Sequence, residues 1–306
     1  MTAKREAQVD IGNVGVVGCG LMGSGIVEVA AKSGFHVMVK ETSPELIDSG
    51  RSRIEQSTDR AVDKEKLTVG ERDAALARIS YTTELADLAR SDLIIEAIVE
   101  DPEAKISLFR DLDKLCSVRA IFASNTSSIP ITEMAAATAR GDQFIGLHFF
   151  NPVPVMKLVE VVRTIATSDE TFELVSDFVQ ALGKVPITAK DNSGFVVNLL
   201  LVPFILDAIR QLERGVASVS DIDTGMVLGC GHPMGPLTLC DFVGIDTLLR
   251  ISEIMYEEYH EERYSPPPLL KRVMAMGRLG KKSGQGFYDW SGEEPVPLVL
   301  QQGSYT

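Results

Sequence analysis

Short runs of β-branched and apolar residues alternate with longer amphipathic stretches from residue 13 to about residue 190. Each short run has the length and composition of a buried strand, and each longer stretch has helical spacing. We expect strands at residues 13–17, 36–39, 92–97, 120–124, 143–148, 157–162 and 185–189. We expect helices at residues 21–34, 44–76, 102–115, 128–139 and 169–183. This alternation predicts a mostly parallel sheet with helices on both faces, which is an α/β fold.

The pattern changes near residues 192–194. From residue 196 onward, helical periodicity continues and strand alternation is almost absent. We expect helices at residues 196–215, 218–229, 236–260 and 269–280. The sequence therefore predicts two domains, an α/β domain over residues 1–192 and an all-α domain over residues 193–306.

Three of the expected helices begin with a capping signal. Ser43 and Asp101 each stand directly before a proline, an order that favours a helix N-terminus. Ser218 and Asp221 have the spacing of a capping box. These signals predict helix starts close to all three positions.

The 306-residue chain has a formal net charge of −13. This charge opposes non-specific attraction to nucleic acid and to anionic membranes, so we expect neither partner. The first ten residues lack the apolar core of a signal peptide, and no later window has the long uncharged run of a membrane span. We therefore expect a soluble, cytoplasmic protein.

The four cysteines are Cys19, Cys116, Cys230 and Cys240. Their spacing matches neither a metal-ligand motif nor a disulfide framework. We expect buried free thiols in a reducing compartment and no bound metal. The sequence assigns no role to Cys19 or Cys230.

A glycine-rich turn joins the first expected strand to the first expected helix. Its glycines allow a tight turn and let a pyrophosphate approach the amide groups of the helix N-terminus. About 20 residues further on, Glu41 ends the second strand, where an acid bonds the ribose diol of a dinucleotide. These features predict a Rossmann-like domain that binds NAD. The expected cofactor contacts from this region are Gly18, Gly20, Leu21, Met22, Gly23 and Glu41.

The glycine turn has a simpler interpretation as well. It could pack a helix on the sheet without binding a ligand, and Glu41 could be one surface acid among many. The position of the turn between strand and helix favours cofactor binding. The charge of Glu41 disfavours a 2′-phosphate and so favours NAD over NADP, whereas the neighbouring Lys40 weakens that preference.

Five further segments carry a resemblance to a known family. They are SNTSS (124–128), GLHFFNPVPVMKLVEVV (146–162), SGFVVNLLLVPFILDAI (193–209), HPMGPLTLCDFVGIDT (232–247) and GKKSGQGFY (280–288). Together they resemble the (S)-3-hydroxyacyl-CoA dehydrogenases, especially the short-chain 3-hydroxybutyryl-CoA enzymes. The resemblance runs collinearly over nearly the whole chain, which makes it far more specific than the glycine motif. It implies NAD-dependent interconversion of a 3-hydroxyacyl-CoA and a 3-ketoacyl-CoA.

The resemblance also implies roles for four residues. His148 corresponds to the general base of the family and Glu160 to the carboxylate that orients it. Ser127 corresponds to the residue that contacts the substrate's 3-oxygen, and Asn198 to the polar residue that helps to hold the substrate. An imidazole that titrates near neutrality suits removal of a hydroxyl proton, and a carboxylate on its other nitrogen fixes the tautomer.

Each of these four residues also has a structural interpretation. A histidine at a strand end is commonly a satisfied structural side chain, and Glu160 could face water. Ser127 could cap the helix that follows it, and Asn198 could be a buried amide with structural partners. Prolines between His148 and Glu160 interrupt regular structure, so we expect the two side chains on neighbouring elements within hydrogen-bonding reach.

Less specific matches extend the site. The resemblance implies cofactor contacts from Glu100, Lys105, Asn151 and Lys282, and coenzyme A contacts from Ser57 and Lys64. Glu100 and Lys105 could instead be an exposed pair one helical turn apart, and Lys282 is one of two adjacent lysines. Ser57 and Lys64 lie in a stretch of alternating charge that ordinarily forms a solvated helix face. An acidic protein nevertheless needs a local cation for a phosphorylated ligand.

The family resemblance further implies a homodimer formed through the helical domain. The apolar stretches 196–206 and 236–255 suit such an interface, although apolarity fits a buried core equally well.

Two other functions fit the same layout: a sugar-acid dehydrogenase of the gulonate type and a non-catalytic, crystallin-like NAD-binding protein. Acyl chain length, direction of the reaction, pathway and strict cofactor selectivity are not encoded in these motifs.

Overall fold

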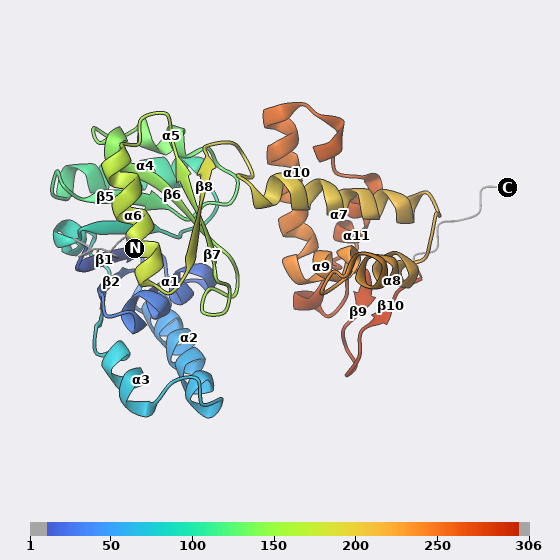
Figure 1. Cartoon of the computed structure of the whole chain (residues 1–306), viewed down its shortest axis with the longest axis horizontal. Coiled ribbons are helices and arrows are strands. Elements are labelled where there is room, and N and C mark those ends of the chain that lie inside the picture. The colour runs from blue at the N-terminus through green and yellow to red at the C-terminus, as the bar shows by residue number, and fades with distance from the viewer. Residues whose placement is uncertain (1–10, 300–306) are drawn as a thin grey trace, which may run out of the picture. The chain divides into compact units, whose positions relative to one another are not determined.

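The computed structural model describes residues 11–299 (Figure 1). The chain divides into two compact units, of which one ends at Phe195 and the other begins at Val196. Each unit has its own buried core.

The first unit contains an eight-stranded sheet in the order β3-β2-β1-β4-β5-β6-β7-β8. Neighbouring strands are parallel except for β6 and β7, which are antiparallel. The strands are β1 (Asn13–Val17), β2 (His36–Lys40), β3 (Ile79–Thr82), β4 (Leu93–Glu96), β5 (Ile121–Ser124), β6 (Phe144–Phe149), β7 (Leu158–Arg163) and β8 (Val185–Lys190). The mostly parallel sheet confirms the expected fold class, and β3 is a strand that the sequence pattern did not predict.

Helices cover both faces of this sheet because strand side chains point alternately to either side. Leu93 and Ile95 of β4 pack in one apolar cluster with residues of α1 and α6. Ile94 packs in a second cluster with residues of α4 and α5. The helices are α1 (Leu21–Lys32), α2 (Pro44–Asp63), α3 (Val69–Leu76), α4 (Pro102–Leu115), α5 (Ile131–Ala135) and α6 (Asp169–Ala181), with 3₁₀ turns at Leu85–Arg90 and Gly141–Gln143.

Two helix predictions in the first unit were too long. The stretch 44–76 forms two helices rather than one, because Thr68 and Glu71 make a reciprocal capping box that starts α3. The stretch 128–139 shortens to the five residues of α5. The capping predictions at Ser43 and Asp101 are confirmed, since their side chains accept hydrogen bonds from the amides of Leu46 and Ala104.

The second unit is built mainly of helices. Ser218 accepts a hydrogen bond from the amide of Asp221 at the start of α8, as its spacing predicted. The expected helix 236–260 is broken at Gly244, which has φ +99°. A short antiparallel ribbon, β9 (Tyr288–Asp289) with β10 (Val296–Pro297), adds to the predicted helices. The helices are α7 (Val197–Glu213), α8 (Val219–Cys230), α9 (Pro236–Val243), α10 (Ile245–Tyr259) and α11 (Pro268–Ala275), with 3₁₀ turns at Glu262–Tyr264 and Lys281–Ser283.

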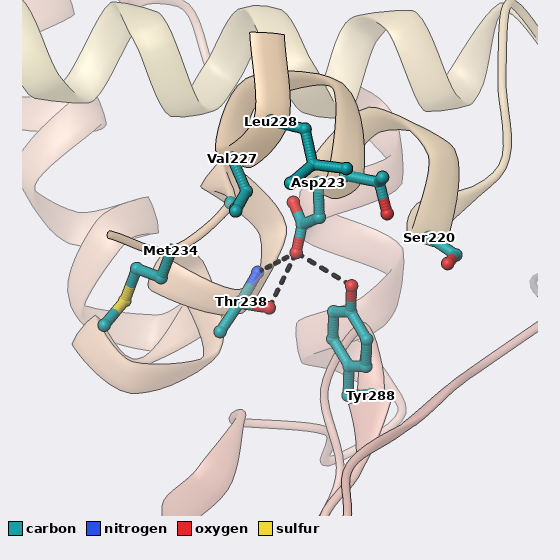
Figure 2. Close-up of a pocket in the computed structure, with 9 residues that line it drawn as sticks. Ser220, Asp223, Val227, Leu228, Met234, Thr238 and Tyr288 are labelled. Atoms are coloured by element: carbon teal, nitrogen blue, oxygen red, sulfur yellow. Dashed lines mark hydrogen bonds between the residues drawn. The ribbon is translucent and has the colours of Figure 1, made fainter. Parts of the chain in front are cut away.

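Asp223 of α8 binds the start of α9 in this unit. Its carboxylate accepts hydrogen bonds from the amide and hydroxyl of Thr238 and from the hydroxyl of Tyr288 (Figure 2). It also accepts one from the amide of Leu237. A cavity of about 360 Å³ lies beside it, lined also by Met234 and Leu228. Because all four donors come from this chain, Asp223 has a structural role in joining three segments.

Asp241 of α9 holds the segment GKKSGQGFY in the same way. Its carboxylate accepts three hydrogen bonds of 2.9 Å, from the amides of Phe287 and Tyr288 and from Nε1 of Trp290. The backbone approaches so closely that a Cβ on Gly286 would lie 2.0 Å from Asp241 Oδ1. Burial raises the pKa of the Asp241 carboxyl above its ordinary value, although the three N–H donors oppose this shift.

Replacement of Asp241 by alanine should destabilise the second unit strongly. Each of three donors would be left without its acceptor, at a cost of about 1–3 kcal/mol per buried group. We expect Asp241→Ala to lower the Tm of the full chain by roughly 5–10 °C in a thermal unfolding scan. Asp207→Ala removes a mostly exposed carboxylate that pairs with Arg210 and should change the Tm by less than about 2 °C. Equal, small shifts in both variants would contradict the anchoring role of Asp241.

Candidate active site

The carboxyl ends of β1, β4, β5 and β6 lie along one edge of the sheet because these strands are parallel. The strand order reverses at β1, which lies between β2 and β4. Ligands of open α/β sheets bind outside the carboxyl ends of the strands at such a switch point. The glycine turn follows β1 directly, and the loops that follow β4, β5 and β6 carry Glu100, Ser127 and Asn151.

The three glycines of the turn meet three different constraints. Gly18 has φ +91°, and a Cβ there would lie 2.6 Å from the carbonyl oxygen of Ala97. A Cβ on Gly23 would lie 1.9 Å from the carbonyl oxygen of Gly18, so the turn closes tightly onto α1. A Cβ on Gly20 would meet nothing within 4 Å, which leaves the backbone open to a ligand. Leu21, at the first position of α1, is 67% exposed, and Met22 is partly buried. This open surface at a helix N-terminus fits a pyrophosphate.

A cavity of about 350 Å³ adjoins the turn. Its lining includes Gly18, Lys40, Glu41, Ile98 and Leu108, and so joins the ends of β1 and β2 to α4. The Glu41 carboxylate accepts a hydrogen bond of 2.5 Å from the amide of Cys19 within the turn. The acid predicted to bind a ribose therefore lies beside the predicted pyrophosphate site, and the cavity, which has both apolar and polar lining residues, fits the adenosine half of NAD. Lys40 lines the same cavity.

The Cys19 thiol of the turn is buried against this carboxylate. Burial and the negative charge of Glu41 raise the pKa of Cys19 to about 12, against a smaller opposite effect of Arg53. A thiol in this state is a poor nucleophile at neutral pH. Cys19 therefore has a packing role. Its sulfur lies so close to Gly50 that a Cβ on this glycine would be only 2.5 Å from Cys19 Sγ.

His148 and Glu160 face each other across the antiparallel pair β6 and β7. The sheet register makes them direct partners, and His148 Nδ1 lies 2.5 Å from Glu160 Oε2. The predicted contact is therefore present. Glu160 is completely buried, so the interpretation that it faces water is wrong. With Nδ1 donating to the carboxylate, His148 keeps Nε2 as a proton acceptor.

The loop after β6 is held by a lysine that no sequence pattern singled out. Lys184 is buried, and its ammonium donates hydrogen bonds to the carbonyl oxygens of Val153 (2.6 Å) and Met156 (2.7 Å). Burial and the charge of Lys32 lower the pKa of Lys184, against a smaller opposite effect of Glu28. Asn151, in a cis peptide with Pro152, is exposed in this loop.

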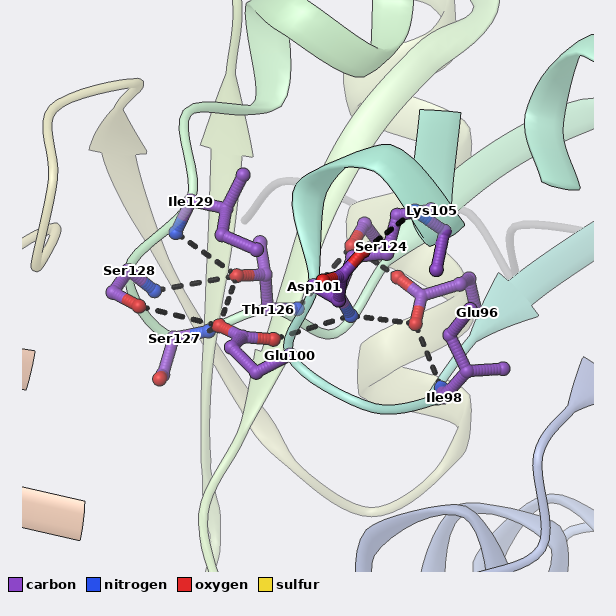
Figure 3. Close-up of polar contacts among 11 residues, drawn as sticks. Glu96, Ile98, Glu100, Asp101, Lys105, Ser124, Thr126, Ser127, Ser128 and Ile129 are labelled. Carbon is purple, nitrogen blue, oxygen red and sulfur yellow. Dashed lines mark hydrogen bonds and ion pairs between the residues drawn. The ribbon is translucent and has the colours of Figure 1, made fainter. Parts of the chain in front are cut away.

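Lys105 and Glu100 form an ion pair in which the lysine is buried and the glutamate partly buried, so the alternative of an exposed pair is wrong. Lys105 is 1% exposed, and its Nζ lies 2.6 Å from Glu96 and 3.2 Å from Glu100 (Figure 3). Glu96 was missed from the sequence, although an acid that ends the apolar run Leu93–Ile95 is an unusual residue in a buried strand.

Ser127 lies in the loop between β5 and α5, and its amide donates to Glu100. The interpretation that Ser127 caps the following helix is wrong, because no side chain at the N-cap position bonds the first turn of α5. The first amides of α5, those of Ile131 and Thr132, donate instead to the carboxylate of Asp191. Ser127 is thus a partly buried residue at the carboxyl edge of the sheet, close in the chain to the Glu100 contact.

The remaining predicted site residues are spread over α2 and the second unit. Ser57 is partly buried on α2, and Lys64 caps the C-terminal end of that helix and is exposed. Asn198 is buried in α7. Lys282 is exposed and donates a hydrogen bond of 2.6 Å to Asp246 within the second unit.

Residues 11–299 contain neither a membrane-spanning helix nor a cluster of metal-binding side chains. Within this range, no helix combines the length and the apolarity that a bilayer crossing needs. The same residues include no cluster of three His, Cys, Asp or Glu side chains with the geometry of a metal site.

A glycine turn at the switch point, an acid beside it and a buried His–Glu pair at the same sheet edge define a dinucleotide-dependent dehydrogenase. Residues 13–192 match the family model for the 3-hydroxyacyl-CoA dehydrogenase NAD binding domain, and residues 194–290 match the model for the C-terminal domain of that enzyme. The chain belongs to the 3-hydroxyacyl-CoA dehydrogenase family, and NAD is its cofactor.

Individual relatives cover almost the whole chain. It is 51% identical over 282 residues to a 3-hydroxybutyryl-CoA dehydrogenase of Mycobacterium tuberculosis, covering 92% of this chain and 99% of the relative. It is 46% identical to the human mitochondrial hydroxyacyl-coenzyme A dehydrogenase, covering 94% and 95%. Among solved structures, the (S)-3-hydroxybutyryl-CoA dehydrogenase PaaH1 of Ralstonia eutropha matches with a TM-score of 0.89 and 45% identity, covering 92% and 100%.

Replacement of Glu41 by alanine should relax cofactor selectivity. Loss of a charged acceptor for the ribose hydroxyls costs about 1.5–3 kcal/mol, so we expect NADH to bind roughly tenfold or more weakly, with a smaller loss for NADPH. Fluorescence titration of both cofactors measures the two changes. Glu45→Ala removes an exposed acid four residues away and serves as the control. Unchanged selectivity in Glu41→Ala would remove Glu41 from the ribose site.

Proposed function

We propose that the chain interconverts (S)-3-hydroxyacyl-CoA and 3-ketoacyl-CoA, with 3-hydroxybutyryl-CoA as the substrate type, and that His148 is the general base. The observation that carries this proposal is the buried His148–Glu160 pair at the sheet edge that also bears the glycine turn. The names of the relatives support the acyl-CoA substrate. An intact pair in this position also argues against a non-catalytic, crystallin-like role.

The chemistry follows from the arrangement of the pair. Bound NAD would supply the acceptor for the hydride that leaves C3 of the hydroxyacyl group. His148 Nε2 takes the proton of the 3-hydroxyl group, and the carboxylate of Glu160 stabilises the imidazolium that results. In the reverse direction His148 returns the proton. Burial of Glu160 strengthens this stabilisation because water does not screen the pair.

Two polar residues are proposed to hold the reacting oxygen. Hydrogen bonds from Ser127 and Asn198 would stabilise negative charge that develops on it in the transition state. Ser127 is supported by its place in the loop that follows β5 at the carboxyl edge, and Asn198 by its burial in an otherwise apolar helix segment. Glu100, Lys105, Asn151 and Lys282 are proposed on the cofactor side of the site.

The coenzyme A moiety needs a local cation because the chain as a whole is acidic. We assign this part to α2 and its C-cap, because Ser57 in the helix and Lys64 at its end are seven residues apart, a spacing that favours one face. A sugar-acid substrate would need no such contact. Comparison of turnover with acetoacetyl-CoA and with gulonate separates the two substrate classes, and activity with gulonate alone would overturn our assignment.

We further propose a cytoplasmic homodimer that forms through the second unit. Several large apolar side chains of that unit are exposed, among them Leu200, Leu228 and Met276. We propose that they belong to one apolar patch, because contiguous patches of this kind commonly mark an interface between subunits. Analytical ultracentrifugation of the full chain measures the oligomeric state directly, and a monomer at micromolar concentration would contradict the dimer.

Replacement of His148 by glutamine should separate catalysis from cofactor binding. Loss of the positioned base should reduce kcat for acetoacetyl-CoA reduction by roughly 10²–10⁴-fold. NADH binding should stay within about twofold, because the glycine turn and Glu41 are untouched. His36→Gln changes an exposed histidine at the start of β2 and should keep full activity. Near wild-type turnover in His148→Gln would show that another group is the base.

A further inference from the structure

Glu96 is a buried carboxylate to which the mechanism above assigns no part. It is the last residue of β4 and is completely buried. Its Oε1 accepts hydrogen bonds from Lys105 Nζ (2.6 Å) and from the amide of Ile98 (2.7 Å), and its Oε2 accepts one from Ser124 Oγ (2.6 Å). A buried charge is costly unless it is paired and hydrogen-bonded, so these contacts mark a built cluster.

Lys105 connects Glu96 to Glu100. Its ammonium, from the first turn of α4, lies between the two carboxylates. Figure 3 shows contacts from this lysine to both acids. Because only 1% of Lys105 is exposed, it differs from a surface cation that binds a phosphate. Its charge compensates for the burial of the two carboxylates.

Glu100 in turn holds the loop that carries Ser127. Its Oε1 accepts hydrogen bonds from Thr126 Oγ1 (2.5 Å), the amide of Ser127 (3.1 Å) and Ser128 Oγ (3.2 Å). Burial alone would raise the pKa of Glu100. The charge of Lys105 and the hydrogen bonds from Thr126 and Ser127 outweigh this effect and hold the pKa below its ordinary value. Glu100 is therefore an ionised acceptor at neutral pH.

The same loop reaches the strand of His148. The amide of Asn125 donates to the carbonyl oxygen of Glu96 (2.9 Å), and Asn125 Oδ1 accepts from the amide of Phe149 (3.0 Å). Phe149 is the neighbour of His148 in β6. One connected set of hydrogen bonds thus runs from Glu96 both to Ser127 and to the residue beside His148.

We propose that Glu96 and Lys105 are positioning residues, which fix the Ser127 loop through Glu100 and so set the place of Ser127 relative to His148. This inference rests on the proposed function. Catalysis by a positioned base and hydroxyl depends on geometry, and a shift of about 1 Å costs up to 10²-fold in rate. Neither Glu96 nor Lys105 needs to touch the substrate for this effect.

The first test is Glu96→Gln in the full chain. The amide keeps the size of the side chain but loses the charge that holds Lys105. We expect kcat for acetoacetyl-CoA reduction to fall by about tenfold or more, with the NADH dissociation constant within about threefold. Glu28→Gln is the matched control, because Glu28 is a buried carboxylate of α1 that pairs with Lys32 at 3.3 Å. Unchanged kcat in Glu96→Gln, or an equal loss in both variants, would overturn the proposal.

The second test is the pH profile of Lys105→Met. Lys105 contacts Glu100 directly, and Glu96 faces the same ammonium. Without this cation, burial and the neighbouring carboxylate raise the pKa of Glu100, which is then protonated at higher pH and loses acceptor capacity. The acid limb of kcat/KM should move up by one pH unit or more relative to wild type and to Glu28→Gln. A profile that superimposes on that of wild type after scaling would show that Lys105 does not act through Glu100.

A third variant keeps the test decisive if Glu96→Gln does not fold. Ser124→Ala removes one donor to Glu96 and leaves the ion pairs intact, and it should lower kcat about threefold. A full wild-type kcat in this variant would count against the proposal.

The wild-type protein separates this inference from the proposed function. If wild type does not reduce any 3-ketoacyl-CoA with NADH, the proposed function fails. If wild type is active and the variants match it, only the positioning role fails.

Discussion

The antiparallel pairing of β6 with β7 is the constraint on which the site depends. Every other neighbouring pair in the large sheet is parallel, and parallel strands need a long crossover connection. Here the chain turns back within residues 150–157, so two chemically important residues become direct cross-strand partners. A register shift by one residue would turn the Glu160 side chain to the other face of the sheet and remove the contact with His148. Apolar packing on both faces makes such a shift costly.

Charge compensation at the carboxyl edge is the second organising feature. Three acids, Glu96, Glu100 and Glu160, are buried or partly buried there in a chain that is already strongly acidic. Each has a basic partner at short distance, Lys105 for the first two and His148 for the third. Pairs of this kind add little net stability compared with apolar packing, but removal of one partner leaves a buried charge uncompensated. They therefore serve geometry more than stability at this edge.

Local signals in the sequence were sufficient for much of the fold. Proline and capping residues predicted the starts of α2 and α4, and β-branched runs predicted seven of the strands in the large sheet. The pattern failed where tertiary contacts outweighed it. Strand β3 is short and only partly buried, so it lacks the apolar run that marks a strand. Helices α9 and α10 continue one periodic pattern and are separated by the backbone conformation of Gly244.

The sequence by itself determined the α/β alternation, the glycine turn with its acid, and the family resemblance that drew attention to His148 and Glu160. These features depend on residue type and on spacing along the chain. The tertiary structure decided the 2.5 Å contact between that pair, the burial of Lys105 between Glu96 and Glu100, and the contact of Lys184 with the loop after β6. Each of these contacts joins residues that lie on different strands, helices or loops. Their distance is set by strand register and by the packing of helices on the sheet, which spacing along the chain does not specify.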